Sequence, residues 1–327
     1  MVTPFKSLAV FTLTIGLAAC GGDDNGSPSS TPTAVPTPTP EATTIVDVAV
    51  ENGGFTTLVA ALQATQLDVV LDDPNGTFTV FAPTDAAFAL LGEDTINSLL
   101  ADTETLSDIL LYHVISGAAV DATAAVASAG MTVEMANTDS VGLSLSGESL
   151  LINTATVILT DIEADNGVIH VIDAVLLPPA DNTEPSSNIV ETAIAAGSFT
   201  TLVTALQAAG LDGTLADEST SFTVFAPTDA AFDVLGTDNI AALLGDPDAL
   251  EAVLLQHVVA GAAVNSIAAY AANGTAVETA SGATIAVAIT GGALMVGGAH
   301  VTMADIYTSN GIIHVIDAVI IGDVPLP

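Results

Sequence analysis

Basic residues are almost absent from this sequence: one Lys, Lys6, and no Arg stand against 38 Asp and Glu, which gives a formal net charge of −37. Nucleic-acid binding relies on Lys and Arg to neutralise phosphates, so the composition excludes nucleic acid as a partner. Cys20 is the single cysteine, and no disulfide can therefore form within the chain. Half of the residues are hydrophobic, which excludes a disordered acidic chain because such chains lack the apolar surface needed to fold.

A long apolar run is missing as well. Lys6 is followed by the apolar stretch Leu8–Ala19, which is shorter than the roughly 20 residues of a membrane span. Residues 1–19 are therefore predicted to be a secretory signal peptide. Their end, Leu17-Ala18-Ala19, precedes Cys20 as in the bacterial lipobox, in which cleavage exposes a cysteine that receives diacylglycerol. We predict lipid attachment at Cys20; the alternative is ordinary cleavage after Ala19 and a soluble secreted protein.

Residues 20–43 are rich in Pro, Thr and Ser. Alternating prolines favour an extended, semi-rigid chain, so this segment is predicted to be a linker that holds the folded part away from the lipid anchor. The expected location is the cell envelope, at an outer membrane or cell surface, facing the periplasm or the exterior. Membrane contact is expected through the anchor only.

The rest of the chain is an internal repeat. FTVFAPTDAAF at 78–88 recurs at 222–232, and the NGVIHVIDAV of 166–175 recurs as NGIIHVIDAV at 310–319, so both motifs are displaced by 144 residues. A repeat of this length has the size of a domain rather than of a solenoid unit. We predict two domains of one fold, over residues 44–179 and 188–324, joined by a linker at 180–187.

Local patterns predict short helices first and strands later in each copy, which is an α+β fold. Asn188 and Glu191 form a capping box, with Thr44 and Asp47 in the matching places. A helix over 199–208 is expected to end at Gly210, and the stop is weaker in the first copy, where Gln66 stands.

A buried strand is predicted over 78–82. Thr84 is expected to cap the following helix, and Asp85 to favour its positive end. Thr228 and Asp229 repeat this pair. Further helices are predicted at 96–100 and 106–112, short strands through 131–171, a turn at Asn166-Gly167, and a closing strand over 168–176.

Three motifs resemble the landmarks of the fasciclin-like domain: TVFAPTDAAF, then LLYHVISG at 110–117, then NGVIHVIDAVLLP at 166–178. The second copy keeps all three, with Gln256 in place of Tyr112. The resemblance implies a β-wedge or sandwich flanked by short helices, of the kind found in secreted or surface-anchored adhesion and matrix proteins.

The resemblance also implies candidate adhesion residues. An Asp-Ile pair before the NG motif and a Tyr-His region are implicated in adhesion in vertebrate members of the family. Here Asp161-Ile162 and Asp305-Ile306 resemble the first, and Tyr112-His113 resembles the second. The alternative is that both isoleucines are core residues and that each Asp ends a strand.

The remaining candidates for chemistry give no enzyme signal. Four histidines lie in apolar runs, which favours hydrogen-bonded core positions in the family motifs: His113, His170, His257 and His314. No spacing suits zinc, and Asp161, Glu163 and Asp165 lack the glycine and glutamate of a calcium loop. His300 has no counterpart in the first copy and is expected to be exposed. No nucleophile elbow or phosphate loop is present, so no cofactor or metal is expected.

Three functions follow in order of preference. The first is adhesion, through binding of extracellular matrix, polysaccharide or a cell-surface protein. The second is a structural envelope protein without a dedicated ligand, and the third a small-ligand carrier. The acidic composition further predicts a halophilic protein, because high salt screens the repulsion among carboxylates.

Overall fold

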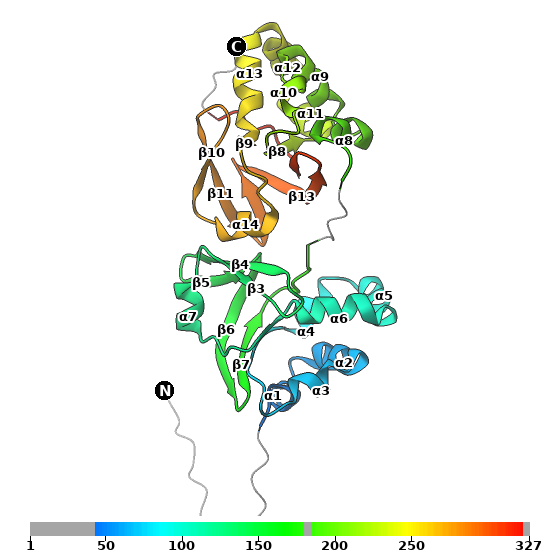
Figure 1. The fold of residues 1–327 in the computed structure, drawn as a ribbon, viewed down its shortest axis with the longest axis vertical. Coiled ribbons are helices and arrows are strands. Elements are labelled where there is room, and N and C mark those ends of the chain that lie inside the picture. Colours follow the sequence, from blue (N-terminus) through cyan, green and yellow to red (C-terminus); the bar gives the residue numbers. More distant parts are fainter. Residues whose placement is uncertain (1–42, 180–184, 323–327) are drawn as a thin grey trace, which may run out of the picture. The chain divides into compact units, whose positions relative to one another are not determined.

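A computed structural model describes residues 43–179 and 185–322 (Figure 1). The predicted signal peptide, Cys20 and nearly all of the predicted Pro-rich linker lie outside the described residues, as do residues 180–184 of the predicted linker between the domains. Two domains repeat the same order of elements, α1 to β7 and α8 to β14. No helix within the described ranges is both long and apolar enough to span a membrane.

The first domain begins with helices and ends with strands. Its helices are α1 (Ile45–Asn52), α2 (Thr56–Thr65), α3 (Leu67–Leu71), α4 (Asp85–Ala89), α5 (Glu93–Ala101), α6 (Thr103–Leu111) and α7 (Ala122–Ala127). Its strands are β1 (Phe78–Pro83), β2 (Val114–Ser116), β3 (Thr132–Glu134), β4 (Ser140–Ser146), β5 (Ser149–Ile152), β6 (Ala155–Ala164) and β7 (Gly167–Ile172).

The second domain follows the same plan. Its helices are α8 (Ile189–Ala196), α9 (Thr200–Ala209), α10 (Asp212–Leu215), α11 (Asp229–Leu235), α12 (Thr237–Gly245), α13 (Pro247–Gln256) and α14 (Ser266–Ala271). Its strands are β8 (Phe222–Pro227), β9 (Val258–Ala260), β10 (Ala276–Glu278), β11 (Thr284–Thr290), β12 (Ala293–Val296), β13 (Ala299–Thr308) and β14 (Gly311–Ile316).

Each domain contains one seven-stranded sheet, with the order β2-β1-β7-β6-β5-β4-β3 in the first. The pairing of β1 with β7 is parallel, with Phe81 opposite His170, whereas the other pairs are antiparallel. The sheet curves into a nearly closed wedge flanked by short helices, so the predicted α+β wedge is confirmed. The element order is mixed, because β1 precedes α4 to α6 and β2 precedes α7 in the sequence. Strand β1 nevertheless pairs with the last strand, β7.

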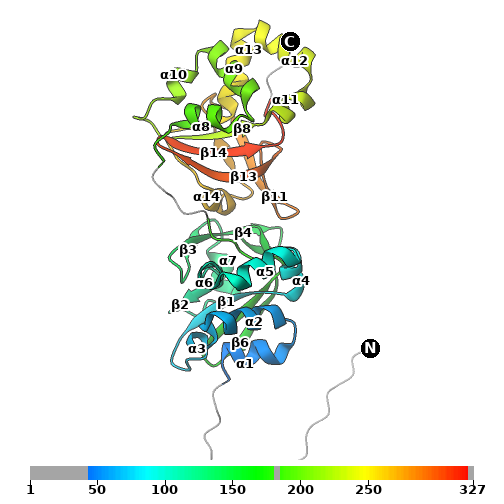
Figure 2. The same cartoon turned by 90° about the vertical axis from the view of Figure 1, so that its right-hand side faces the viewer.

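The β1–β7 pair separates two hydrophobic cores. One face of β1 presents Phe78 and Val80 to a core formed with helices α1, α2, α4 and α6. On the other face, Phe81 joins Ile152 and Ile172 in the core of the wedge. The second domain repeats this arrangement. In Figure 2, helices α8 to α13 lie on one side of β14, whereas β11 and α14 lie on the other side. Strands buried on both faces read as continuous apolar runs, which is why the FTVFAP motif stands out in the sequence.

The helix boundaries follow the predicted caps. Both capping boxes form: the Thr44 and Asn188 side chains accept from the backbone of Asp47 and Glu191, whose carboxylates bond back to the cap residues. Helix α9 ends at Gly210, in the left-handed region with φ 67°. Gln66 adopts the same conformation with φ 61° and ends α2 at the matching residue, so the stop does not depend on glycine.

The turn before the last strand differs from the prediction. Gly167 is the first residue of β7, which ends at Ile172 rather than at residue 176. Its φ is 154°, and a Cβ built there would lie 2.0 Å from the Phe78 carbonyl oxygen. Glycine is therefore required for close approach to β1 rather than for the tight turn, which is made by the two residues before it.

Candidate functional site

Asp161 and Asp305 both occupy irregular positions within a strand. The β6–β7 register shifts twice before Ile162, and the β13–β14 register shifts at the matching points. The φ values are 57° at Asp161 and 60° at Asp305, a left-handed conformation that Asp tolerates better than most residues. A β-bulge of this kind turns side chains away from the regular alternation of the sheet.

The carboxylate of each Asp holds the N-terminus of a neighbouring helix. Asp161 Oδ1 accepts from the backbone N–H of Ala122, the first residue of α7, at 2.8 Å. Asp305 Oδ1 accepts from the backbone N–H of Ser266 at 2.7 Å, and the Ser266 hydroxyl donates to Asp305 Oδ2. Since a helix N-terminus carries partial positive charge, these bonds couple the bulge to α7 and α14.

The backbone at each bulge is tied to a buried histidine. The N–H of Asp161 points at His170 Nδ1 at 3.4 Å, and His170 Nε2 lies 2.8 Å from the Val120 carbonyl oxygen. Both contacts are satisfied when Nε2 carries the proton and donates it to Val120. The ring of His170 also stacks on Phe81, with centroids 5.7 Å apart.

The second domain repeats these contacts. Asp305 N–H lies 3.3 Å from His314 Nδ1, and His314 Nε2 lies 2.8 Å from the Val264 carbonyl oxygen. Burial lowers the pKa of His314, although its bond to Val264 and the charge of Asp305 oppose the shift. A neutral ring is what these two contacts need, because Nδ1 must accept.

The isoleucines and the aspartates face different environments. Ile162 and Ile306 are half-buried and pack against the helical cores of their domains. Asp161 is exposed, while Asp305 is half-buried. The alternative that these isoleucines are core residues thus fits both of them. The exposed surface around each Asp is formed by other residues.

Sequence reasoning missed the apolar residues that accompany Asp161 on the surface. Ile158 and Leu159, in the same strand, are 57% and 54% exposed, and Met303 is 59% exposed at the place matching Leu159. Two consecutive exposed apolar residues break the alternation expected of a strand with one buried face. In the sequence the same stretch is visible as the apolar run Val157-Ile158-Leu159.

The Tyr112-His113 pair lies in the interior. Tyr112 has no exposed surface, its hydroxyl donates to the Ser140 carbonyl oxygen at 2.7 Å and accepts from Asn153 Nδ2 at 3.0 Å, and burial raises its pKa. Direct contact with a partner would require Tyr112 and His113 to leave the core. Gln256, the residue matching Tyr112, is buried as well.

His113 and His257 join α6 and α13 to the segments that follow β7 and β14. His113 Nδ1 lies 2.7 Å from the Ile109 carbonyl oxygen, and Nε2 accepts from the Leu176 N–H at 2.9 Å. His257 bonds in the same way to Val253 and Ile320. Burial lowers the pKa of both to about 4, against a weaker opposing effect of the carbonyl bonds.

The Thr-Asp motif does not act on one helix alone. Thr84 and Thr228 cap α4 and α11 by accepting from Ala87 and Ala231 N–H at 3.1 and 3.3 Å. Asp85, however, accepts from the N–H groups of Thr56 and Thr57, at 3.2 and 2.7 Å.

Asp85 therefore caps α2 in addition to lying in the first turn of its own helix, α4. Asp229 makes the same contacts with Thr200 and Thr201 of α9. Burial acts to raise the pKa of both carboxyls, but the bonds from the threonines together lower it. The sequence did not predict the bonds to α2, because that helix begins about thirty residues earlier, at Thr56 for Asp85.

His300 is exposed on β13. In the part of the chain that the structure describes, no group of three or more His, Cys, Asp or Glu side chains is placed to hold a metal ion. Every buried side-chain nitrogen and oxygen there has a hydrogen-bond partner. The β6 bulge thus combines an exposed carboxylate, Asp161, with exposed apolar residues of the same strand.

Both domains contain the same wedge, the same bulge and the same buried histidines. The model of the fasciclin domain matches residues 53–178 and 197–322, and the chain therefore belongs to the fasciclin domain family.

Similar proteins come from several lineages. An uncharacterized protein of Synechocystis is 45% identical over 133 residues, which is 41% of this chain and 96% of that protein. The cell surface glycolipoprotein MPB83 of Mycobacterium bovis is 35% identical over 139 residues, 42% of this chain and 61% of that one. The transforming growth factor-beta-induced protein ig-h3 of Sus scrofa is 29% identical over 275 residues, 83% of this chain and 38% of that protein.

The fasciclin domain pair of the insect cell adhesion molecule fasciclin I is similar in structure, with a TM-score of 0.38 and 20% identity, over 84% of this chain and 98% of that one.

Proposed function

We propose that this protein is a surface-anchored adhesion module, which binds extracellular matrix, polysaccharide or a cell-surface protein through its two fasciclin domains and has no enzymatic activity. The observation that carries the proposal is the bulge of β6. There an exposed carboxylate, Asp161, follows two exposed apolar residues, Ile158 and Leu159, in the same strand. Mixed apolar and polar surfaces of this kind favour protein or sugar partners.

The anchor forms part of the same proposal. Cys20 is the only cysteine and would carry the lipid, and residues 20–43 would act as the spacer. The name of MPB83 describes that relative as a cell surface glycolipoprotein, which supports an envelope location here. A Cys20→Ser variant is expected to appear in the medium instead of the membrane fraction.

The proposed binding units are residues 44–179 and 188–324, joined by 180–187. Two linked modules gain avidity because the second binding event becomes intramolecular. The half-buried Asp305, bonded twice to Ser266, has less carboxylate surface available than Asp161. The first domain is therefore the stronger candidate for contact with a partner.

A binding assay in molar NaCl tests the proposal, with the host cell envelope and a second copy of the protein as targets. Asp161→Asn removes the charge but keeps an oxygen for Ala122 and a residue that tolerates positive φ. Asp305→Asn is the matched control in the second domain. We expect Asp161→Asn, or the pair Ile158→Ser and Leu159→Ser, to weaken saturable binding at least threefold with unchanged melting.

If the wild type binds neither target, the alternative of a structural envelope protein without a dedicated ligand is favoured. If all variants bind as the wild type does, adhesion is retained but the contact surface lies away from the β6 bulge.

A further inference from the structure

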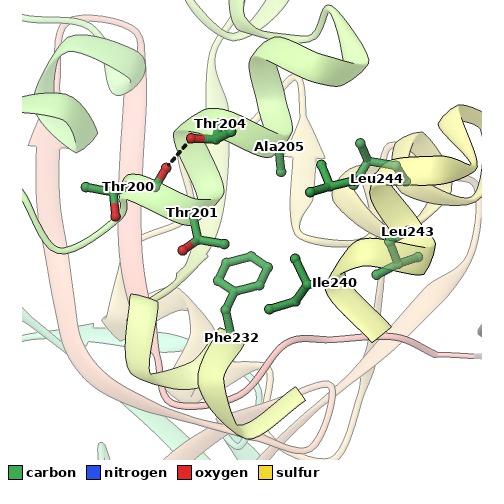
Figure 3. Close-up of a pocket in the computed structure, with 9 residues that line it drawn as sticks. Thr200, Thr201, Thr204, Ala205, Phe232, Ile240, Leu243 and Leu244 are labelled. Carbon is green, nitrogen blue, oxygen red and sulfur yellow. Dashed lines mark hydrogen bonds between the residues drawn. The ribbon is translucent and has the colours of Figure 1, made fainter. Parts of the chain in front are cut away.

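The helical layer of the second domain contains an open apolar pocket of about 230 Å³. Side chains from α9, α11, α12 and α13 line it, and Figure 3 shows Phe232 at its floor with Ile240 and Leu244 on one side and the threonines of α9 on the other. Leu244 is 44% exposed, so the pocket opens to solvent beside it. The residues that line this pocket are not part of the proposed adhesion site.

The first domain has the same pocket at positions displaced by 144 residues. Seven lining residues are identical in the two copies, Ala60 replaces Thr204, and Thr200 lines only the second pocket. The volume in the first domain is about 40 Å³, too small for more than a few atoms. The two domains can therefore be compared directly, because their pockets have nearly the same apolar lining but different volumes.

The polar groups of the pocket are already engaged. The N–H groups of Thr200 and Thr201, the first two of α9, donate to Asp229, so these two donors are not available to an anion. The Thr204 hydroxyl donates to the Thr200 carbonyl oxygen at 2.8 Å (Figure 3). None of the residues that line the pocket is ionisable, and the net charge of −37 repels anions at long range.

We propose that the pocket of the second domain binds a neutral apolar group the size of an alkylbenzene. An apolar protein cavity of about 150 Å³ accommodates benzene, so this pocket has room for a ring with a short alkyl substituent. The walls supply dispersion contacts and burial of apolar surface, and the lack of a counter-charge excludes carboxylates and ammonium groups. The inference stands independently of adhesion at the β6 bulge.

The test is a titration of the protein with ethylbenzene, followed by NMR of its isoleucine and leucine methyl groups in molar NaCl. Benzoate, which carries the same ring with a negative charge, is titrated in parallel. We expect saturable shifts at Ile240, Leu243 and Leu244 with ethylbenzene, no shift at Ile96 and Leu99, and at least tenfold weaker binding of benzoate.

Two pairs of variants locate the ligand. Thr204→Phe fills the pocket from an exposed position on α9 and is expected to weaken ethylbenzene binding at least tenfold, whereas Ala60→Phe in the first domain leaves it unchanged. Leu244→Ala removes one wall and should weaken binding about threefold or more, against its counterpart Leu100→Ala. Because both leucines are partly exposed, at 44% and 41%, these truncations leave a folded protein to measure.

Absence of shifts at Ile240 and Leu243, equal affinity for benzoate, or equal losses in the paired variants of the two domains would each overturn the proposal.

Discussion

The buried histidines are the residues at which pH acts most directly on this fold. His113 and His257 accept a backbone N–H through Nε2, and protonation would replace that acceptor with a donor. Their pKa of about 4 in the folded state lies below the ordinary value of 6.5. The unfolded chain therefore binds protons at a higher pH than the folded chain does.

This difference fixes the sign of the pH dependence. Above pH 6.5 both states are neutral at these rings and the full stability is present; as the pH falls from about 6.5 to about 4, the unfolded state gains protons first and the folded state is destabilised. We expect a loss of roughly 2–3 kcal/mol per domain over that window, of which about 2 kcal/mol is reached by pH 5. Urea unfolding at pH 7 and at pH 5, in molar NaCl, measures it.

Ring nitrogen shifts in NMR provide the control for this expectation. Both rings should remain in the neutral Nδ1–H form at pH 5.5. Protonation of His113 and His257 near pH 6.5 in the folded protein would contradict it.

The side chain of Asn166, a turn residue, forms hydrogen bonds to the start of α1 and to the end of α3. Its Nδ2 donates to the carbonyl oxygens of Leu71 and Asp73, at 2.8 and 3.0 Å, and its Oδ1 accepts from Ile45 N–H at 2.8 Å. The sequence identified Asn166 as a turn residue, but these partners lie more than 90 positions away. Local patterns contain no information on such contacts, so this role was not predictable.

Replacement of Asn166 by Ala should be strongly destabilising. The change leaves buried backbone groups without partners, each at a cost of about 1–3 kcal/mol, and we expect a total of roughly 2–4 kcal/mol by urea unfolding. Asn97, exposed on α5, is the matched control, for which Asn97→Ala should change stability by less than about 0.5 kcal/mol. A loss at Asn166 no larger than at Asn97 would mean that water replaces the three bonds.

At the scale of the element, the two copies end the same helix with different residues. Gln66 and Gly210 both adopt positive φ at the ends of α2 and α9. A side chain in this conformation costs about 1–2 kcal/mol, while glycine loses more backbone entropy, by about 0.5–1 kcal/mol.

The balance favours glycine at both sites. Gln66→Gly is expected to stabilise the first domain by about 0.5 kcal/mol, and Gly210→Gln to destabilise the second by a similar amount or more. Thermal unfolding of both variants against the wild type gives the comparison. Effects of the same sign at the two positions would show that side-chain contacts of Gln66, rather than backbone conformation, decide the result.

The elements themselves were largely accessible to sequence reasoning, and their connections were not. Capping boxes and the β1 strand are specified within a few residues, by Thr44 with Asp47 and by the FTVFAP run. The parallel pairing of β1 with β7, the cap that Asp85 places on α2, and the bulge at Asp161 depend on contacts between distant segments. Such contacts are set by tertiary packing, which local propensity does not contain.

For the whole molecule, charge of one sign is the dominant feature. All 38 acidic residues follow Cys20, and no Lys or Arg accompanies them, so exposed carboxylates repel one another without compensation by ion pairs. Two such groups about 7 Å apart repel by roughly 0.6 kcal/mol in water. The repulsion is screened over about 10 Å at 0.1 M salt and about 3 Å at 1 M.

High salt should therefore stabilise both domains. We expect the melting temperature at pH 7.5 to rise by roughly 5–15 °C between dilute buffer and molar NaCl, equivalent to a few kcal/mol. Sucrose at equal osmolality separates screening from general solvent exclusion, because sucrose strengthens burial without screening charge. An equal rise in sucrose, or a melting temperature that is flat in NaCl, would argue against charge repulsion and with it against the halophilic proposal. A rise in NaCl alone would mean that the fold tolerates its charge because its surroundings screen it.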